Sequence, residues 1–258
     1  MPRRDEYIYG VHAVGHALRK SPENALELWV QQGDRVSEVR ELVCFAEIHR
    51  LPVHRVPRKT LDRLANQARH QGVVLRCRRA RALGDAELVT LLDRLSEQPL
   101  LLVLDGVQDP QNLGACLRVA DAAGVDGVVI RRDRAAGLTA TVRKVASGAA
   151  DSVPLLQVSN LARAIRQMQD AGLWLVGAEP DAKESLYQVD LTVPLVLVLG
   201  AEDKGLRRLT RECCDHLVHL PMLGSVESLN VAVASGVCLF EALRQRRNEG
   251  TKLQPQGP

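Results

Sequence analysis

The sequence predicts an α/β protein with a small N-terminal α/β domain and a larger domain, built on a mostly parallel sheet with helices on both faces. Three observations predict this. The chain has 258 residues, which is enough for two domains. From residue 99 onwards, near-continuous apolar runs alternate with helical patterns, as in parallel sheets covered on both faces. The charge also changes sign: residues 1–82 carry 16 Lys and Arg against 9 Asp and Glu, and residues 83–258 carry 18 against 22.

The first domain is expected at residues 1–77. Its predicted elements are a strand, a helix, a strand, a helix, a strand, a short helix and a strand, at residues 7–9, 10–19, 26–30, 36–49, 53–56, 61–65 and 72–77. Thr60 is a plausible N-cap for the short helix.

Residues 78–98 are interpreted as a linker that begins with basic residues and continues with leucines at helical spacing. The second domain is expected at residues 99–247, and the Gly-, Pro- and Gln-rich residues 248–258 are expected to form a disordered tail. In the second domain, strands are predicted at residues 100–104, 125–130, 173–177 and 194–199. Helices are predicted at residues 112–123, 139–147, 161–171 and 228–246.

The composition excludes several classes of protein. No run of 18 apolar residues is present, and the first residues lack the apolar stretch of a signal peptide, so we expect a soluble cytoplasmic protein. No cysteine pair or histidine has the spacing of a zinc site, so no metal is expected. The six cysteines are interpreted as buried free thiols, although the adjacent Cys213 and Cys214 leave a redox-active pair open.

The basic charge of the first domain is concentrated between residues 50 and 81, where ten Lys and Arg stand against one acidic residue, Asp62. Such a patch favours a polyanion through phosphate contacts and counterion release. An ordinary solvated surface is the alternative. Aromatic side chains for stacking on bases are scarce and limited to Tyr7, Tyr9, Trp29 and Phe45.

Three separate segments of the second domain carry candidate chemistry, and the first follows the strand that ends at Leu104. Ligand sites in open α/β sheets lie at such carboxyl edges. Asn112 is well suited to cap the next helix, and Arg118 lies beside the apolar stripe of that helix, so it can point towards the strand ends. A plain helix cap and a surface arginine remain the alternative.

The second segment is a loop bracketed by Gly200 and Gly205, again after an apolar strand. Glycine allows the backbone to approach a ligand closely. Leu206 and Arg207 follow instead of Lys and Ser or Thr, so this is not a phosphate-binding loop. Its acidic residues Glu202 and Asp203 fit a neutral or cationic ligand better.

The third segment is a loop rich in Pro, Gly and Ser that follows a short strand and precedes a helix of small residues. Ser228 is a suitable cap for this helix, whose free N–H groups would face a ligand in the loop. The small residues allow close packing against another element. An ordinary cap with tight packing is the alternative.

Together the three segments resemble the signature motifs of the SpoU (TrmH) branch of the SPOUT RNA methyltransferases, over roughly residues 99–246. The first motif is matched by Asp109-Pro110-Gln111-Asn112-Leu113-Gly114 with Arg118. The second is matched by Gly200-Ala201-Glu202 with Gly205-Leu206, and the third by Pro221-Met222 through Ser225-Val226 and by Ser228-Leu229-Asn230-Val231. Glu227 departs from the family pattern, which has a small residue there. Gly10–Val14 and His70–Val73 resemble the N-terminal substrate-binding domain of one member.

The resemblance implies a fold, a reaction and a set of site residues. It implies a C-terminal trefoil knot, an N-terminal domain like ribosomal protein L30e, a homodimer, and S-adenosylmethionine as methyl donor without a metal. The expected reaction methylates the ribose 2′-hydroxyl of a specific guanosine in 23S ribosomal RNA. A transfer-RNA methyltransferase of the same family and a non-catalytic RNA-binding relative are the alternatives. The catalytic residues implied are Asn112, Arg118, Glu202, Ser228 and Asn230. The donor-binding residues implied are Leu199, Gly200, Ala201, Gly205, Leu220, Met222 and Leu229.

Overall fold

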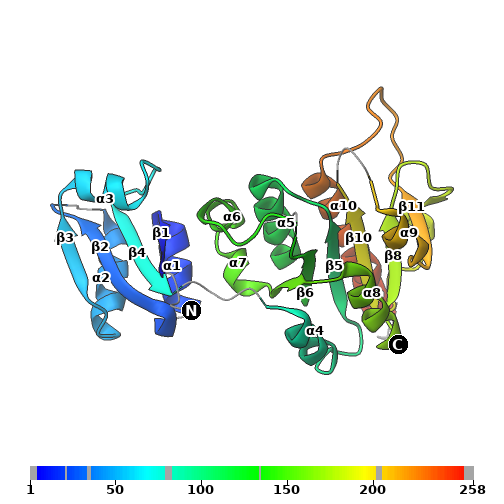
Figure 1. Cartoon of the computed structure of the whole chain (residues 1–258), viewed down its shortest axis with the longest axis horizontal. Helices are drawn as coiled ribbons and strands as arrows, with labels where there is room; N and C mark the ends of the chain where they lie inside the picture. Colours follow the sequence, from blue (N-terminus) through cyan, green and yellow to red (C-terminus); the bar gives the residue numbers. More distant parts are fainter. Residues whose placement is uncertain are drawn as a thin grey trace, which may run out of the picture. The chain divides into compact units, whose positions relative to one another are not determined.

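A computed structural model describes residues 5–20, 22–33, 36–78, 83–133, 135–201 and 205–252. The chain divides into two compact units (Figure 1). The first comprises residues 1–81 together with residues 138–152, and the second comprises residues 82–137 and 153–258.

The first unit contains a four-stranded sheet with the strand order β1-β4-β2-β3. Strand β4 is antiparallel to β1 and β2, and β2 is parallel to β3. The elements of this unit are β1 (Asp5–Tyr9), α1 (Val11–Lys20), η1 (Pro22–Asn24), β2 (Ala25–Gln31), α2 (Ser37–Ile48), β3 (Val53–Val56), α3 (Arg58–Leu64), β4 (Val73–Arg78), α6 (Ala140–Ala146) and α7 (Ala149–Ser152).

Helices cover both faces of this sheet. Helices α1 and α2 pack on one face around Val14, Leu28 and Val43, and α3 packs on the other through Leu61, against Val74. One expectation is wrong. Helix α3 begins at Arg58 and its N-cap is Pro57, so Thr60 lies in the first turn and does not cap it. Proline cannot donate a hydrogen bond, and its fixed φ suits this helix boundary.

The second unit contains a seven-stranded sheet in which all neighbouring strands are parallel, in the order β7-β6-β5-β10-β8-β11-β9. The α/β class and the parallel sheet predicted from the sequence are confirmed. The elements are α4 (Asp85–Leu92), β5 (Leu100–Asp105), α5 (Pro110–Ala122), β6 (Gly127–Arg131), β7 (Leu155–Val158), α8 (Leu161–Asp170), β8 (Trp174–Ala178), β9 (Glu184–Ser185), η2 (Leu186–Gln188), β10 (Leu195–Gly200), α9 (Arg208–Glu212), β11 (His216–His219) and α10 (Val231–Lys252).

The apolar strands of this unit are buried on both faces, which explains why their hydrophobic runs are continuous. Leu101 and Val103 of β5 belong to the core that contains residues of α4 and α8. Leu102 and Leu104, which alternate with them, are completely buried as well. On this other side of the sheet, α10 packs against both α5 and β10.

Three predicted helix ends differ from the structure. Helix α5 begins at Pro110, and its N-cap is Asp109, not Asn112. Helix α10 begins at Val231 instead of residue 228. Helix α10 also extends to Lys252, so the expectation of a disordered tail is wrong for residues 248–252. Residues 253–258 lie outside the described residues.

The cysteines are free, but only some are buried. Cys77, Cys116 and Cys238 are buried, Cys213 and Cys214 are half-buried, and Cys44 is exposed. Burial raises the pKa of the Cys77, Cys214 and Cys238 thiols to about 12. The expectation that all six are buried is therefore wrong for Cys44, which lies on the solvent side of α2.

Candidate active site

Two loops at the carboxyl edge of the second unit's sheet contain predicted site residues, and the first of them follows β10. Gly200 ends this strand, opposite Asp105 at the end of β5. A Cβ atom on Gly200 would lie 2.1 Å from the carbonyl carbon of Gly205, so only glycine fits there. The Gly205 N–H donates a hydrogen bond of 2.9 Å to the Ala201 carbonyl, which closes the loop. Glu202, predicted to be catalytic, lies outside the described residues.

Asp105 holds the far side of this loop, a role the sequence reading did not assign. Its side chain is completely buried and accepts a hydrogen bond of 3.1 Å from the Arg207 N–H. The Arg207 Nε lies 3.4 Å from the other carboxylate oxygen. A single carboxylate at the end of the otherwise apolar β5 was the available signal, since a buried carboxylate requires a partner. The pair fixes the position at which the chain leaves the loop.

Asn112 and Asn230 meet at the point where α5 and α10 begin. The Asn230 Nδ2 donates a hydrogen bond of 2.9 Å to the Asn112 Oδ1. The Asn230 Oδ1 accepts one of 3.0 Å from the Ala232 N–H, so Asn230 is the N-cap of α10. The prediction that Ser228 caps this helix is therefore wrong. The structure joins the first and third predicted segments directly, 118 residues apart in sequence.

Small side chains allow α5 and α10 to pack closely, as the sequence indicated for the last helix. The Ser235 hydroxyl is completely buried, donates 2.7 Å to the Val231 carbonyl and lies 3.6 Å from the Cys116 Sγ. A Cβ atom on Gly236 would stand 3.7 Å from a methyl group of Val119. This packing fixes the orientation of the Asn112–Asn230 pair.

The second loop, residues 220–230, projects from the sheet between β11 and α10 (Figure 1). Within the described residues, residues 221–229 make no hydrogen bond through backbone or side chain. Their backbone groups must therefore be satisfied by water or by a ligand. Leu220, Met222 and Leu229 are half-buried, whereas Ser228 is exposed.

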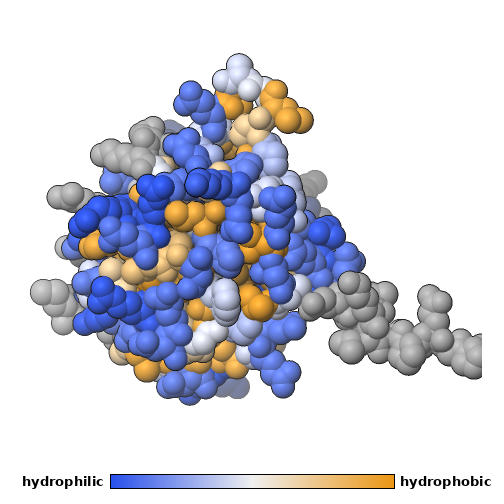
Figure 2. Space-filling model, turned by 90° about the vertical axis from the view of Figure 1, so that its right-hand side faces the viewer, coloured by the Kyte–Doolittle hydropathy of each residue, from blue (hydrophilic) through white to orange (hydrophobic). Residues whose placement is uncertain are grey.

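The loop also carries exposed apolar side chains. Leu223 is fully exposed and Val226 is 60% exposed, and hydrophobic residues gather on the projection at the top of Figure 2. On α10, Val233 and Phe240 are about half exposed. Large exposed apolar residues of this kind are typical of surfaces that are covered by a partner.

Arg118 lies on a different face of α5 from Asn112, which pairs with Asn230. It is exposed on α5, and among the described residues no hydrogen bond or ion pair to its guanidinium is present. It follows Asn112 by six positions, which places the two side chains on different faces of the helix. The structure brings Asn112 and Asn230 together. The loops that carry Gly200 and Leu220 follow β10 and β11, which lie on either side of β8. Arg118 is not brought to the asparagine pair.

Over the part of the chain that the structure describes, no three His, Cys, Asp or Glu side chains gather as metal ligands. Over the same residues, no helix is long and apolar enough to cross a membrane.

Known families match both parts of the chain. The SpoU rRNA Methylase family matches residues 99–240, and the family described as RNA 2'-O ribose methyltransferase substrate binding matches residues 7–83. The chain belongs to the SpoU rRNA methylase family.

Individual relatives match nearly the full length. The chain is 51% identical to the 23S rRNA (guanosine-2'-O-)-methyltransferase RlmB of Shewanella oneidensis, over 95% of this chain and 100% of that protein. It is 54% identical to the enzyme of the same name from Pseudomonas aeruginosa, over 93% of this chain and 97% of that one.

Solved structures of RNA methyltransferases are similar to this chain over nearly its full length. An RNA 2'-O ribose methyltransferase has a TM-score of 0.80 at 28% identity, covering 95% of this chain and 90% of that one. The SpoU methyltransferase AviRb of Streptomyces viridochromogenes, in complex with the cofactor AdoMet, has a TM-score of 0.79 at 25% identity, covering 95% and 91%.

Proposed function

We propose that this protein transfers the methyl group of S-adenosylmethionine to the ribose 2′-hydroxyl of a specific guanosine in 23S ribosomal RNA. One observation carries the proposal. The curated 23S rRNA guanosine methyltransferases are about half identical to this chain over nearly all of its length, including the N-terminal unit. A transfer-RNA enzyme is favoured less, because the A. aeolicus TrmH/SpoU tRNA modifying enzyme covers only 67% of this chain, at 28% identity.

The residues at the sheet edge fit the methyl donor. The unpaired backbone of residues 221–229 offers donors and acceptors for an adenosine, and Leu220, Met222 and Leu229 offer half-buried apolar contacts. Gly200 and Gly205 present backbone without side chains at the end of β10, which is separated from β11 by β8. When bound, the donor supplies an electrophilic methyl group on a cationic sulfonium. Leu199, Gly200, Ala201 and Gly205 are proposed to bind it together with the second loop.

The protein must make a neutral 2′-hydroxyl nucleophilic or stabilise the oxyanion that develops on it. Asn112 and Asn230 are proposed to orient the ribose, because their amides hold each other in place at the two helix starts. Ser228 and Glu202 are proposed to line the same site. Arg118 is proposed to bind a phosphate of the RNA and to stabilise the oxyanion. It is not proposed as a general base, because a guanidinium keeps its proton.

Arg118 is proposed to act in the site of a second copy. It has no partner among the described residues and lies off the face that holds Asn112. The exposed Val233 and Phe240 on α10 and Leu223 on the loop support a homodimer around these helices. A trefoil knot is proposed for the C-terminal segment, with support from the position of β10 between β5 and the earlier β8.

The two units are proposed to divide the work. Residues 1–77 would bind RNA and residues 99–247 would catalyse methyl transfer, apart from residues 138–152, which belong to the first unit. The expected linker at residues 78–98 contains α4, which packs in the core of the second unit, and the expected tail at residues 248–258 begins within α10. The cytoplasm is the proposed compartment, because that is where a bacterial ribosomal RNA would be modified.

Mass mapping of 2′-O-methyl groups on 23S ribosomal RNA, with and without the active gene, tests the reaction. One guanosine methylation should disappear with the protein and return when the purified protein and donor are added to the unmodified RNA. An unchanged methylation map would overturn the proposal, and failure to bind the donor in titration calorimetry would favour a non-catalytic RNA-binding protein.

Mixing two inactive variants tests the shared site. Arg118→Ala and Asn230→Ala should each be inactive, and their mixed dimer should regain part of the activity because one of its two sites is intact. No recovery in a mixture that forms heterodimers would place Arg118 in the site of its own chain.

A further inference from the structure

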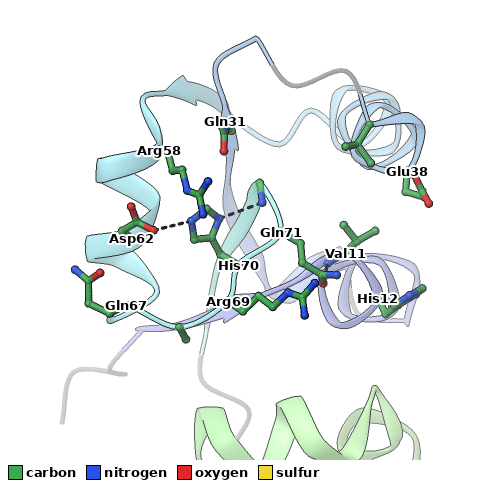
Figure 3. A pocket seen from close by; sticks show the side chains of 13 residues that line it. Val11, His12, Gln31, Glu38, Arg58, Asp62, Gln67, Arg69, His70 and Gln71 are labelled. Carbon is green, nitrogen blue, oxygen red and sulfur yellow. Dashed lines mark hydrogen bonds and ion pairs between the residues drawn. The ribbon is translucent and has the colours of Figure 1, made fainter.

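The first unit contains a cleft of about 590 Å³, a volume within the range of ligand sites. Helix α3 forms one side, helix α1 and the start of α2 form the other, and the end of β2 lies at the back (Figure 3). The loop between α3 and β4 closes it. The cleft lies in the unit that is proposed to bind RNA, and nothing in the methyl-transfer site accounts for it.

His70 anchors the loop that lines this cleft. The imidazole is 4% exposed, and both of its ring nitrogens are used (Figure 3). The Gly72 N–H donates 3.1 Å to Nδ1, so Nδ1 is the acceptor and Nε2 carries the hydrogen. Nε2 then donates 3.0 Å to the Asp62 carboxylate on α3. This hydrogen bond fixes the loop to α3 and occupies one oxygen of the Asp62 carboxylate.

The same loop has an unusual backbone. Gln67 and Gln71 both have positive φ, at 64° and 52°, although neither is glycine. Such conformations persist where the surroundings enforce them, and they are frequent at binding sites. Here the Gln71 Oε1 accepts 3.3 Å from the Val11 N–H at the start of α1, which turns the amide of Gln71 into the cleft. The Gln71 Nε2 remains available as a donor.

The cations of the cleft are available to a ligand. Arg58 and Arg69 line it from α3 and from the loop, both are exposed, and neither forms an ion pair with a described residue. The two carboxylates of the lining are already engaged or distant from them. Asp62 pairs with His70, and Glu38 lies across the cleft on α2, hydrogen-bonded to Ser37.

The remaining polar side chains of the lining are three amides and the imidazole of His12. Gln31 at the end of β2 and Gln67 and Gln71 in the loop each offer a donor or an acceptor. Amides of this kind read the edges of bases, while arginines bind phosphate or stack on a base. Among the described residues that line the cleft there is no Phe, Tyr or Trp, and the rings present are the imidazoles of His12 and His70.

We propose that this cleft binds one unpaired nucleotide of the RNA substrate, with its phosphate at Arg58 and Arg69 and its base edge against Gln31 and Gln71. A concave site excludes a double helix, and proteins read RNA sequence mostly at unpaired bases in loops and bulges. The proposal rests on the proposed ribosomal RNA substrate, for which it names the feature that the first unit recognises.

Binding of a fluorescent single-stranded RNA of about eight nucleotides, of mixed sequence, tests the cleft in the whole protein. In Arg58→Gln/Arg69→Gln the affinity should fall at least roughly 10-fold, and the slope of log K against log salt should become shallower by about 0.7, as expected when one phosphate of a single strand is no longer neutralised. In Gln31→Leu the affinity should fall by roughly 10-fold, the effect of one base contact, with an unchanged slope. The control Arg55→Gln/Arg63→Gln removes two exposed arginines outside the cleft lining and should change the affinity much less.

Equal losses in the cleft and control variants would overturn the proposal, because the charge would then act diffusely. A duplex RNA of the same length, or heparin, that competes as well as the single strand would also overturn it. Thermal unfolding verifies that each variant is folded. On ribosomal RNA, the cleft variants should raise KM and leave kcat unchanged. Absence of methylation by the unaltered protein would overturn the proposed function instead, and the oligonucleotide binding would still report on the cleft.

Discussion

The Asn230 amide bridges two elements at once: it donates to Asn112 at the start of α5 and accepts from the Ala232 N–H at the start of α10. This one side chain therefore fixes where α10 begins and how the start of α10 is placed against the start of α5. Because the proposed ribose site lies at these two helix starts, its geometry depends on both hydrogen bonds.

Substitutions of Asn230 separate the two bonds. Serine is a good N-cap but is too short to reach Asn112, whereas alanine loses both bonds. We expect Asn230→Ser to unfold at nearly the same denaturant concentration as the unaltered protein, and Asn230→Ala to lose about 1 kcal/mol of unfolding free energy. Both should lose most methyl-transfer activity, measured with tritiated donor. Full activity in Asn230→Ser would show that the Asn112 contact is not needed.

Arg118→Ala should lower the rate of methyl transfer at least roughly 10²-fold, the scale of losing one oxyanion donor. Titration calorimetry should find donor binding unchanged, because the donor is proposed to bind at the loops after β10 and β11. Arg118→Lys keeps the charge but not the planar fork, and an intermediate rate is expected. Near-normal turnover of the alanine variant would remove Arg118 from the mechanism.

Gly200→Ala should disrupt the loop after β10 without unfolding the sheet. The added methyl group would overlap backbone atoms of Gly205, which cannot move like a side chain. We expect the donor dissociation constant to rise at least roughly 10-fold, from a loss of about 1.4 kcal/mol. Gly137→Ala is the control, since its Cβ would meet only Gln157, at 3.5 Å. Unchanged donor affinity in Gly200→Ala would separate this loop from the donor site.

Arg246 should be needed for the stability of the second unit. Its guanidinium donates to the carbonyls of Gln98, Pro99, Leu191 and Val193, and burial lowers its pKa. Arg246→Leu leaves these carbonyls without a donor and should lower the unfolding free energy by about 2–4 kcal/mol. The control Arg208→Leu breaks only an exposed pair with Glu212, worth about 1 kcal/mol or less. Urea denaturation compares the two, and equal losses would contradict the role given to Arg246.

Cysteine labelling reports on burial and its effect on thiol pKa. The thiols of Cys77, Cys214 and Cys238 have pKa values of about 12, so they remain protonated and unreactive as the pH rises from 7 to 9. Iodoacetamide at pH 8 should modify the exposed Cys44 first. Peptide mass mapping should find the other three modified only after denaturation. Prompt modification of Cys238 in the folded protein would contradict its burial.

The sequence predicts the parallel sheet well, because each buried strand is a continuous apolar run with a helix after it. It predicts helix starts less well where two capping residues stand close together. Asp109 and Asn112 both qualify by type, and Pro110 was the deciding signal, since proline favours the first helical position. Ser228 and Asn230 posed the same choice without such a signal.

The pattern of the sequence does not predict contacts between segments that are far apart along the chain. Motif resemblance selected Asn112 and Asn230, but periodicity does not encode their hydrogen bond. The partner of Asp105 could not be predicted either, since Arg207 lies 102 positions away. In the first unit, His70 and Gln71 stood out by resemblance alone, and the cleft they line depends on how α3, α1 and β2 meet.

Arg246 donates hydrogen bonds to Gln98 and Pro99, which directly precede β5 and lie 148 and 147 positions earlier in the sequence. A nascent chain therefore exposes the first strand of this sheet long before the helix that secures it has been synthesised. Asn112 is likewise synthesised 118 positions before Asn230, with which it forms a hydrogen bond. Long-range closure of this kind slows folding and prolongs the exposure of apolar strands. We expect the catalytic unit to mature only after translation has passed α10, so a product truncated before this helix would not bind the donor.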